Sequence, residues 1–344
     1  MSDQPPAGPA GSGAFARRAG RIAAEVLLPA AMQVESSGRV PKAHLDLLAA
    51  EGLYGMAGPA DSGGLDVDFA EACAAVEVLA GACLSTTFVW LQHHGAVRAV
   101  AASGDARLRR EWLRPLCLGA RRAGVALGGT LPGPPRLRAA PAPGGYAFDG
   151  VSPWVTGWGY IDTLHTAART EDGTIVWALL DASTGSGLTV EPLDMVAVMA
   201  SSTVQARFDR LHVPAGRITG TLPFERWAER DAAGLRMNGS LALGVAGRCC
   251  QLIGPGPLDG ELAAARAALD AGTAQTMPAA RAAACELAIR AAAALVVTQG
   301  STAILAGADA QRLAREALFL LVFGSRPPIK EALAGLLTGR SSSS

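Results

Sequence analysis

The feature that most constrains this chain is the change in hydrophobic periodicity along its length. Up to about residue 118, apolar residues recur at helical spacing, as at Phe69, Cys73 and Val76. Between about residues 124 and 221, Gly, Pro and Thr become frequent and short alternating runs replace that spacing. From residue 222 onward the helical spacing returns. The sequence therefore predicts an α+β multidomain fold in which a β region lies between two helical regions.

We place domain boundaries where the periodicity changes, because 344 residues suffice for two or three domains. The expected segments are a disordered lead (1–15), an N-terminal all-α domain (16–122), a central β-barrel or sandwich domain (123–222), a C-terminal four-helix bundle (223–338) and a disordered tail (339–344). Within them we expect helices over 84–102, 224–253, 258–271, 278–298, 310–321 and 327–337.

Composition excludes several classes of function. Lys+Arg 30 balances Asp+Glu 30, which argues against nucleic acid and anionic membrane partners. We also expect no membrane span, because no charge-free apolar run reaches the necessary length. The cysteines lie in apolar helical stretches without metal-ligand spacing. We therefore expect no metal site, reduced thiols and a cytoplasmic location.

The stretch from Phe148 to Gly159 is the strongest candidate for a site. It contains the dipeptide Asp149-Gly150, which is typical of a hairpin turn. Trp154 and Thr156 follow at or just past the expected end of a strand, and alternation places them on one face. An exposed indole beside a hydroxyl suits a planar heterocyclic ligand, although a core Trp with a turn Thr explains the same pattern.

Four motifs in order resemble those of the acyl-CoA dehydrogenases and their flavin-using relatives over roughly residues 20 to 338. The first is Gly52-Leu53 followed by Pro59 to Leu65, and the second is Phe148-Asp149-Gly150 followed by Trp154-Val155-Thr156-Gly157. The third runs from Ser202 to Pro214, and the fourth from Gln311 to Ala317.

This resemblance implies FAD, with Trp154 against the isoalloxazine face, Thr156 near its N5 edge and Thr130 within reach of the flavin. It further implies oxidation of a CH–CH group in an acyl thioester, carried by CoA or by an acyl carrier protein. The expected electron acceptor is a flavoprotein or oxygen. The C-terminal bundle would build a homodimer or homotetramer.

The chain departs from the family at the catalytic base. Most members carry a Glu near the C-terminus, and here that position falls at or near Gly324. A second set carries the base early in the long bundle helix, and here Gly234 stands near that place. A missing base is a chemical problem, because the α-proton needs an acceptor. Recruitment of a carboxylate from Glu225, Glu229 or Asp231 remains open.

The expected cofactor segments are also altered. The family's Arg-x-x-Phe-Gly segment is replaced by Gly254-Pro255-Gly256-Pro257, and the Gly-Gly pair ahead of Gln311 is reduced to Ala306-Gly307-Ala308-Asp309. In the β region, Gly128 to Pro135 replaces a loop that normally carries an acidic residue. We therefore expect binding of the flavin ring and leave open how the adenylate end is held.

Two histidines could replace the base. His93 and His94 lie in an apolar helix that faces flavin and substrate in the family, and either could act as acid and base. The alternative is one core and one interface histidine. Ser325 and Arg326 could bind a substrate carbonyl or anion, or could cap the next helix. We expect Gln92, Arg236 and Asn238 to contact the substrate.

Three hypotheses follow. The chain is an FAD-dependent dehydrogenase of an acyl thioester with an unidentified base. Alternatively it is a flavin-dependent monooxygenase that uses His93 or His94, as the resemblance to hydroxylases of this fold implies. As a third possibility it is a non-catalytic subunit that pairs with an active relative.

Overall fold

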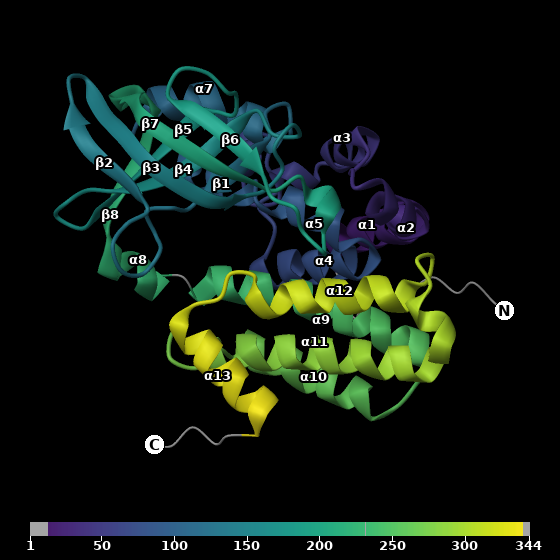
Figure 1. Ribbon diagram of the computed structural model, residues 1–344. Helices are drawn as coiled ribbons and strands as arrows, with labels where there is room; N and C mark the ends of the chain where they lie inside the picture. The colour runs from purple at the N-terminus through teal and green to yellow at the C-terminus, as the bar shows by residue number, and fades with distance from the viewer. Residues whose placement is uncertain (1–12, 231, 340–344) are drawn as a thin grey trace.

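The computed structural model describes residues 13–230 and 232–339. In chain order it has N-terminal helices, a central sheet and C-terminal helices, which confirms the expected fold class (Figure 1). Residues 1–12 of the predicted lead and 340–344 of the predicted tail lie outside the described residues. Helix α1 already begins at Ala14, within the predicted lead.

Most of the N-terminal helices lie to the right of the sheet in Figure 1. Helix α1 (Ala14–Ile22) continues through a π-helical turn (Ala23–Leu27) into α2 (Leu28–Ser37). The other helices are α3 (Lys42–Ala50), α4 (Phe69–Ala82), α5 (Leu84–Leu91), α6 (His94–Ala101) and α7 (Ala106–Cys117). Short 3-10 turns η2 (Leu53–Gly55) and η3 (Ala60–Ser62) lie in the loop between α3 and α4.

The expected single helix over 84–102 is interrupted. It divides into α5 and α6 at Gln92 and His93, although both residues keep right-handed helical dihedrals. The amide of His93 donates to the Trp90 carbonyl, three residues back, instead of four. This tighter turn bends the helix, and the sequence carries no Pro or Gly at the bend that would predict it.

Within the described residues, eight strands form one sheet. They are β1 (Ala123–Ala126), β2 (Leu137–Ala142), β3 (Gly145–Val155), β4 (Thr163–Arg169), β5 (Thr174–Asp181), β6 (Leu188–Pro192), β7 (Val204–Pro214) and β8 (Ile218–Pro223). Their order is β6-β7-β3-β2-β4-β5-β8, with β1 beside β4. Strand β3 therefore lies between β2 and β7 and carries the Trp154 segment.

The predicted hairpin at Asp149-Gly150 is wrong. The tight turn between β2 and β3 is at Pro143-Gly144, where Gly144 has a φ of 74°. Gly150 instead lies inside β3 at a register shift against β7, with a φ of 124°. A Cβ there would lie 2.2 Å from the Arg136 carbonyl oxygen, so only glycine fits. Gly150 of this dipeptide therefore forms a β-bulge and not a hairpin turn.

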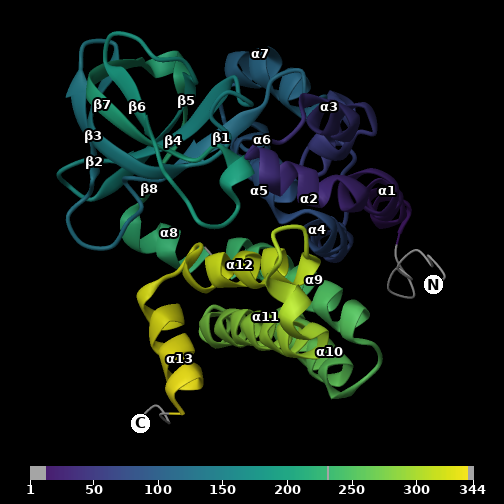
Figure 2. The same cartoon turned by 45° about the vertical axis from the view of Figure 1, so that its right-hand side comes forward.

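The C-terminal helices form the expected bundle from α9 to α12, with α11 in contact with α9, α10, α12 and α13 (Figure 2). Their bounds are α8 (Phe224–Arg230), α9 (Ala232–Ile253), α10 (Pro257–Asp270), α11 (Met277–Gln299), α12 (Asp309–Val322) and α13 (Pro327–Thr338), with a 3-10 turn η6 (Gly300–Ile304). Among the described residues, no helix combines the length and apolar character that crossing a bilayer requires.

Helices α1 to α5 and the bundle share one hydrophobic core, and the sheet has its own. Helices α6 and α7 form a third core with Ala123 and Leu179 of the sheet. Helices α4 and α9 approach closely because Gly81 and Gly244 face each other at their crossing. A Cβ on Gly244 would lie 2.3 Å from the Glu77 carbonyl oxygen and 2.8 Å from the Gly81 amide nitrogen. The backbones can therefore touch only while both positions are glycine.

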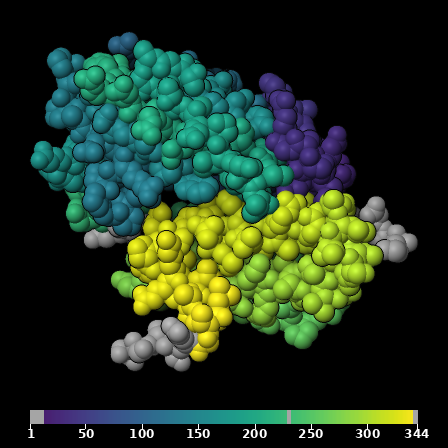
Figure 3. Space-filling view, in the orientation of Figure 1, coloured from purple at the N-terminus to yellow at the C-terminus, as the bar shows by residue number. Residues whose placement is uncertain are grey.

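An ion pair joins all three regions. Arg315 on α12 contacts the buried Glu35 carboxylate on α2 and donates to the Val196 carbonyl oxygen, 3.1 Å away, in the loop between β6 and β7. Figure 3 shows the atoms of the sheet region meeting the upper edge of the yellow C-terminal region. The position of the sheet against the bundle is thereby fixed.

We predict that Gly244→Ala destabilises the protein by about 1–3 kcal/mol, because the added methyl forces α4 and α9 apart. Gly260→Ala is the control, since Gly260 lies on the exposed face of α10 with open space around it. That change should be neutral or stabilising by about 0.5–1 kcal/mol. Urea denaturation of both variants measures this, and equal effects would contradict the close-contact account.

Candidate functional site

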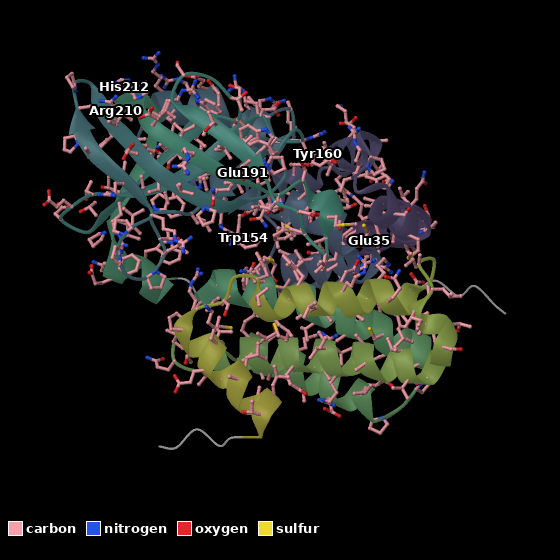
Figure 4. The ribbon with its side chains drawn as sticks, viewed as in Figure 1. Glu35, Trp154, Tyr160, Glu191, Arg210 and His212 are labelled. Atoms are coloured by element: carbon pink, nitrogen blue, oxygen red, sulfur yellow. The ribbon has the colours of Figure 1, made fainter. Side chains whose placement is uncertain are left out.

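Trp154 is an exposed aromatic side chain at the end of the sheet that faces the bundle (Figure 4). Its side chain is 63% exposed, and its φ of 59° is unusual for a non-glycine residue. A register shift between Ser152 and Val155 accompanies this conformation. Such strain costs about 1–3 kcal/mol and is concentrated at functional sites. The backbone thus turns a large aromatic side chain toward solvent, and this side chain does not pack in the core.

The prediction that Trp154 and Thr156 share one strand face is wrong. The bulge breaks the alternation, so Val155 and Thr156 are both buried and Thr156 lies one residue past the end of β3. The Thr156 hydroxyl is 3.2 Å from that of Thr203, which in turn is 2.8 Å from that of Ser201. A short chain of buried hydroxyls therefore begins just behind the Trp154 turn.

Thr130 is buried at the start of the loop that follows β1. Its hydroxyl donates to the Leu127 carbonyl oxygen at 3.0 Å. The Arg169 guanidinium holds the same loop by donating to the carbonyl oxygens of Leu131, at 3.1 Å, and of Gly133. The structure does not bring Thr130 into hydrogen-bond contact with Thr156, and its role stays a prediction.

Helix α5 connects the end of the sheet to the bundle. A Cβ on Gly157 would lie 3.4 Å from the Val89 side chain, so the turn after β3 rests on α5. The preceding residue on α5, Phe88, packs edge-on against Phe319 and Phe323, with ring centres 5.0 and 4.8 Å away. Sequence reasoning missed this aromatic cluster, although the spacing of Phe319 and Phe323 places them on one face of a helix.

The two positions where the resemblance expects a base lie close together. Gly324, in the turn after α12, has a φ of 61°, and a Cβ there would lie 3.2 Å from Nδ2 of Asn238. Asn238 lies one helical turn after Gly234 on α9. Neither position carries a carboxylate, so the loss of the base inferred from the sequence holds for both. The side chains of Glu229 and Asp231 lie outside the described set.

Ser325 and Arg326 follow this turn directly. The Ser325 hydroxyl is buried without a hydrogen-bond partner among the described residues. The Arg326 guanidinium carbon lies 4.9 Å from the centre of the Trp227 ring on α8. No side-chain cap bonds the start of α13, so the capping alternative receives no support.

His93 is unsuited to the predicted acid–base role. Its Nδ1 accepts from the Ala123 amide at 3.0 Å, and its Nε2 donates to the Leu116 carbonyl oxygen at 3.0 Å. Burial lowers its pKa to about 3, because the charged ring would lose its hydration. The ring is therefore a neutral cross-link between α6, α7 and β1.

His94 differs from its neighbour. It is 1% exposed, packs edge-on against Trp90 at 4.6 Å, and neither of its ring nitrogens has a partner among the described residues. Burial lowers its pKa well below the usual value, with smaller contributions from His93 and Arg98. The ring is therefore neutral, with one nitrogen able to donate and the other able to accept a hydrogen bond.

The three predicted substrate-binding residues differ in the contacts that they make. Gln92 donates to the Phe88 carbonyl oxygen at 3.2 Å at the end of α5. Arg236 is engaged elsewhere, because it pairs with Asp270 of α10 at 2.6 Å and donates to Ser240 at 2.9 Å. These bonds argue against its predicted role. Asn238 is half-buried beside Gly324 and stays a candidate.

The residues present fit one part of FAD better than the other. The exposed indole and the hydroxyls behind it match the aromatic face and polar edge of a flavin ring. The turn from Gly254 to Pro257 joins α9 to α10 and offers no cationic side chain to a pyrophosphate. The fit is therefore good at the ring and incomplete at the adenylate end.

We predict that buried histidines make the protein acid-sensitive. The pKa values of His93 and His165 are lowered to about 3 from 6.5, so between these limits the unfolded chain binds protons that the folded protein does not. Stability therefore falls as pH drops below 6.5. His93→Gln should reduce the dependence of unfolding free energy on pH by about one proton, or about 1.4 kcal/mol per pH unit. Denaturation midpoints between pH 7 and 5 measure this, and an unchanged slope would contradict it.

Comparison with known proteins places this geometry in context. Residues 12–120 match the model of the acyl-CoA dehydrogenase N-terminal domain. A probable acyl-CoA dehydrogenase of Bacillus subtilis, YngJ, is 27% identical over 245 residues, which cover 65% of this chain. The aligned region spans 62% of that relative's length.

The fold is also similar to that of solved structures. Butyryl-CoA dehydrogenase from Megasphaera elsdenii superposes with a TM-score of 0.81 at 19% identity, covering 94% of this chain and 97% of that one. PigA, in a structure with FAD and proline, gives a TM-score of 0.80 at 18% identity, with 95% and 97% covered. The chain thus has the acyl-CoA dehydrogenase fold, and the resemblance to the acyl-CoA dehydrogenase family is confirmed.

Proposed function

We propose that the chain is an FAD-dependent oxidoreductase of acyl-CoA dehydrogenase type that acts on an acyl thioester of CoA or of an acyl carrier protein. The observation that carries the proposal is Trp154, a strained and exposed indole at the end of the sheet that faces the bundle. The fold and the names of the compared proteins support the same class.

Each part of the site has a role in this proposal. Trp154 stacks on one face of the flavin ring, and the Thr156 hydroxyl, backed by Thr203, donates to its polar edge. The cluster of Phe88, Phe319 and Phe323 excludes water from the acyl chain. FAD, when bound, supplies the two-electron acceptor that the side chains lack.

The acceptor of the α-proton is the unusual part. The described side chains at Gly324 and Asn238 contain no carboxylate, and Glu225 is exposed on α8. Glu316, the buried acid of α12, is held by Arg312 at 2.8 Å. Glu229, Asp231 or an ordered water therefore remain to receive the proton.

Assembly and surroundings complete the proposal. We expect a homodimer or homotetramer, supported by exposed Val297, Ile304 and Leu305 near the η6 end of the bundle. The electron acceptor is a flavoprotein or oxygen. We keep the domain boundaries 16–122, 123–222 and 223–338. A reducing cytoplasm suits the cysteines, all of which are buried as free thiols.

A second candidate is a flavin-dependent monooxygenase. The observation that favours it is His94, a buried imidazole whose two nitrogens have no partner among the described residues. Neither Gly324 nor Gly234 carries a carboxylate, and hydroxylation needs none because it removes no α-proton. His93 cannot serve this role while both its nitrogens bond the backbone.

An absorption spectrum of the purified protein, recorded without air before and after addition of an acyl-CoA mixture, distinguishes the two functions. We predict a visible flavin absorption band that the thioester bleaches. A band that does not respond, with oxygen consumption that His94→Gln abolishes, would favour the monooxygenase. Absence of any bound flavin, even after reconstitution, would contradict both and support a non-catalytic partner subunit.

A further inference from the structure

Arg281 is a buried cation with no acidic partner. This side chain of α11 is 2% exposed, and none of the described carboxylates forms an ion pair with it. Its Nη1 contacts the Cys285 sulfur, and its Nη2 donates to the Phe323 carbonyl oxygen at 3.5 Å. Removing a guanidinium from water without a counter-charge is costly, so its position calls for an explanation.

The C-terminus of α12 provides part of the compensation. Helix α12 ends at Val322, and its unsatisfied carbonyls carry the negative end of the helix dipole. Cys285 donates to the Leu320 carbonyl oxygen at 3.1 Å, so Arg281 and Cys285 together serve this helix end. The cation therefore lies under the turn that begins at Phe323 and leads to Gly324.

Two further hydrogen-bond donors border the same turn. The position of a Cβ on Gly324 is 3.2 Å from Nδ2 of Asn238, a half-buried amide on α9. The Ser325 hydroxyl, one residue on, is buried and has no partner among the described residues. Buried hydroxyls are normally hydrogen-bonded, so an acceptor for Ser325 is missing here.

We propose that the acyl chain of the substrate supplies that acceptor as a carboxylate, so that the preferred substrates are carboxyacyl thioesters. This inference rests on the proposed function and specifies its substrate class. The turn where the resemblance expects an acid instead presents an amide, a hydroxyl and a nearby positive charge. A carboxylate could satisfy all three groups at once.

Neutral acyl chains are disfavoured for the same reason. An alkyl end placed at the turn would displace water from Asn238 and Ser325 without replacing its hydrogen bonds. It would also leave the Arg281 charge compensated only by the helix end. The preference for a carboxylated chain therefore arises because its carboxylate accepts hydrogen bonds from donors that an alkyl chain leaves unpaired.

Isothermal titration of the purified full-length protein with matched thioesters tests the inference. The pairs are adipyl-CoA against hexanoyl-CoA and glutaryl-CoA against pentanoyl-CoA, which differ only in the terminal carboxylate. We expect the carboxylated member to bind about 10-fold tighter or more, because hydrogen bonds to a charged group are stronger than those between neutral groups.

Asn238→Asp is the decisive variant, because it places a carboxylate at the turn with almost no change in shape. It should reduce the preference to about 2-fold or less through repulsion of the second carboxylate. Gln299→Glu is the control, since it adds the same charge on the exposed end of α11 and should keep the preference.

Three results would overturn the inference. Equal affinity of the wild-type protein for both members of each pair would refute it while leaving the proposed function intact. A preference that survives Asn238→Asp would place carboxylate recognition elsewhere. If no thioester of either kind binds, the proposed function fails and this inference fails with it.

Discussion

The contact between Glu35 and Arg315 is the interaction on which the arrangement of the three regions depends. It ties α2 to α12, and through the Val196 carbonyl it also holds the loop between β6 and β7. That loop carries Ser201 and Thr203, whose hydroxyls support Thr156. Because Glu35 is buried, loss of Arg315 would leave its carboxylate without a counter-charge, so this contact is a strong constraint. The site is therefore built by tertiary docking of three regions.

Within this frame the site combines a strained aromatic surface with unusual electrostatics. The fold places Trp154 outward at a cost in backbone energy that packing does not recover, which indicates a ligand. Close to the C-terminal end of α12, where an acid is expected, stand Asn238, Ser325 and the charge of Arg281. The acidic side chain that α12 does bury, Glu316, is committed to Arg312.

The outline of the fold could be predicted from the sequence because the helical and strand periods are strong. Helix α11 runs from Met277 to Gln299, against a prediction of 278–298. The exposed indole at the end of a strand was one of two interpretations that the sequence left open, and the absence of a carboxylate at Gly324 follows from the sequence itself. Each of these depends on local pattern or on residue identity alone.

The rest depended on contacts between distant residues. The turn at Trp154 requires the register shift against β7, and the cross-link of His93 requires Leu116 and Ala123 to lie beside it. Arg236 is occupied by Asp270, which is 34 positions away. Local periodicity does not predict contacts between distant residues. The sequence therefore identified the candidate residues but not the groups that they contact.

Equilibrium dialysis with FAD tests directly whether Trp154 forms the flavin-binding face. We predict that the wild-type protein retains FAD and that Trp154→Ala binds it at least about 10-fold more weakly, since aromatic stacking contributes about 1–3 kcal/mol per ring. Circular dichroism would confirm that the variant is folded. Equal retention of FAD by both proteins would show that Trp154 does not form this face.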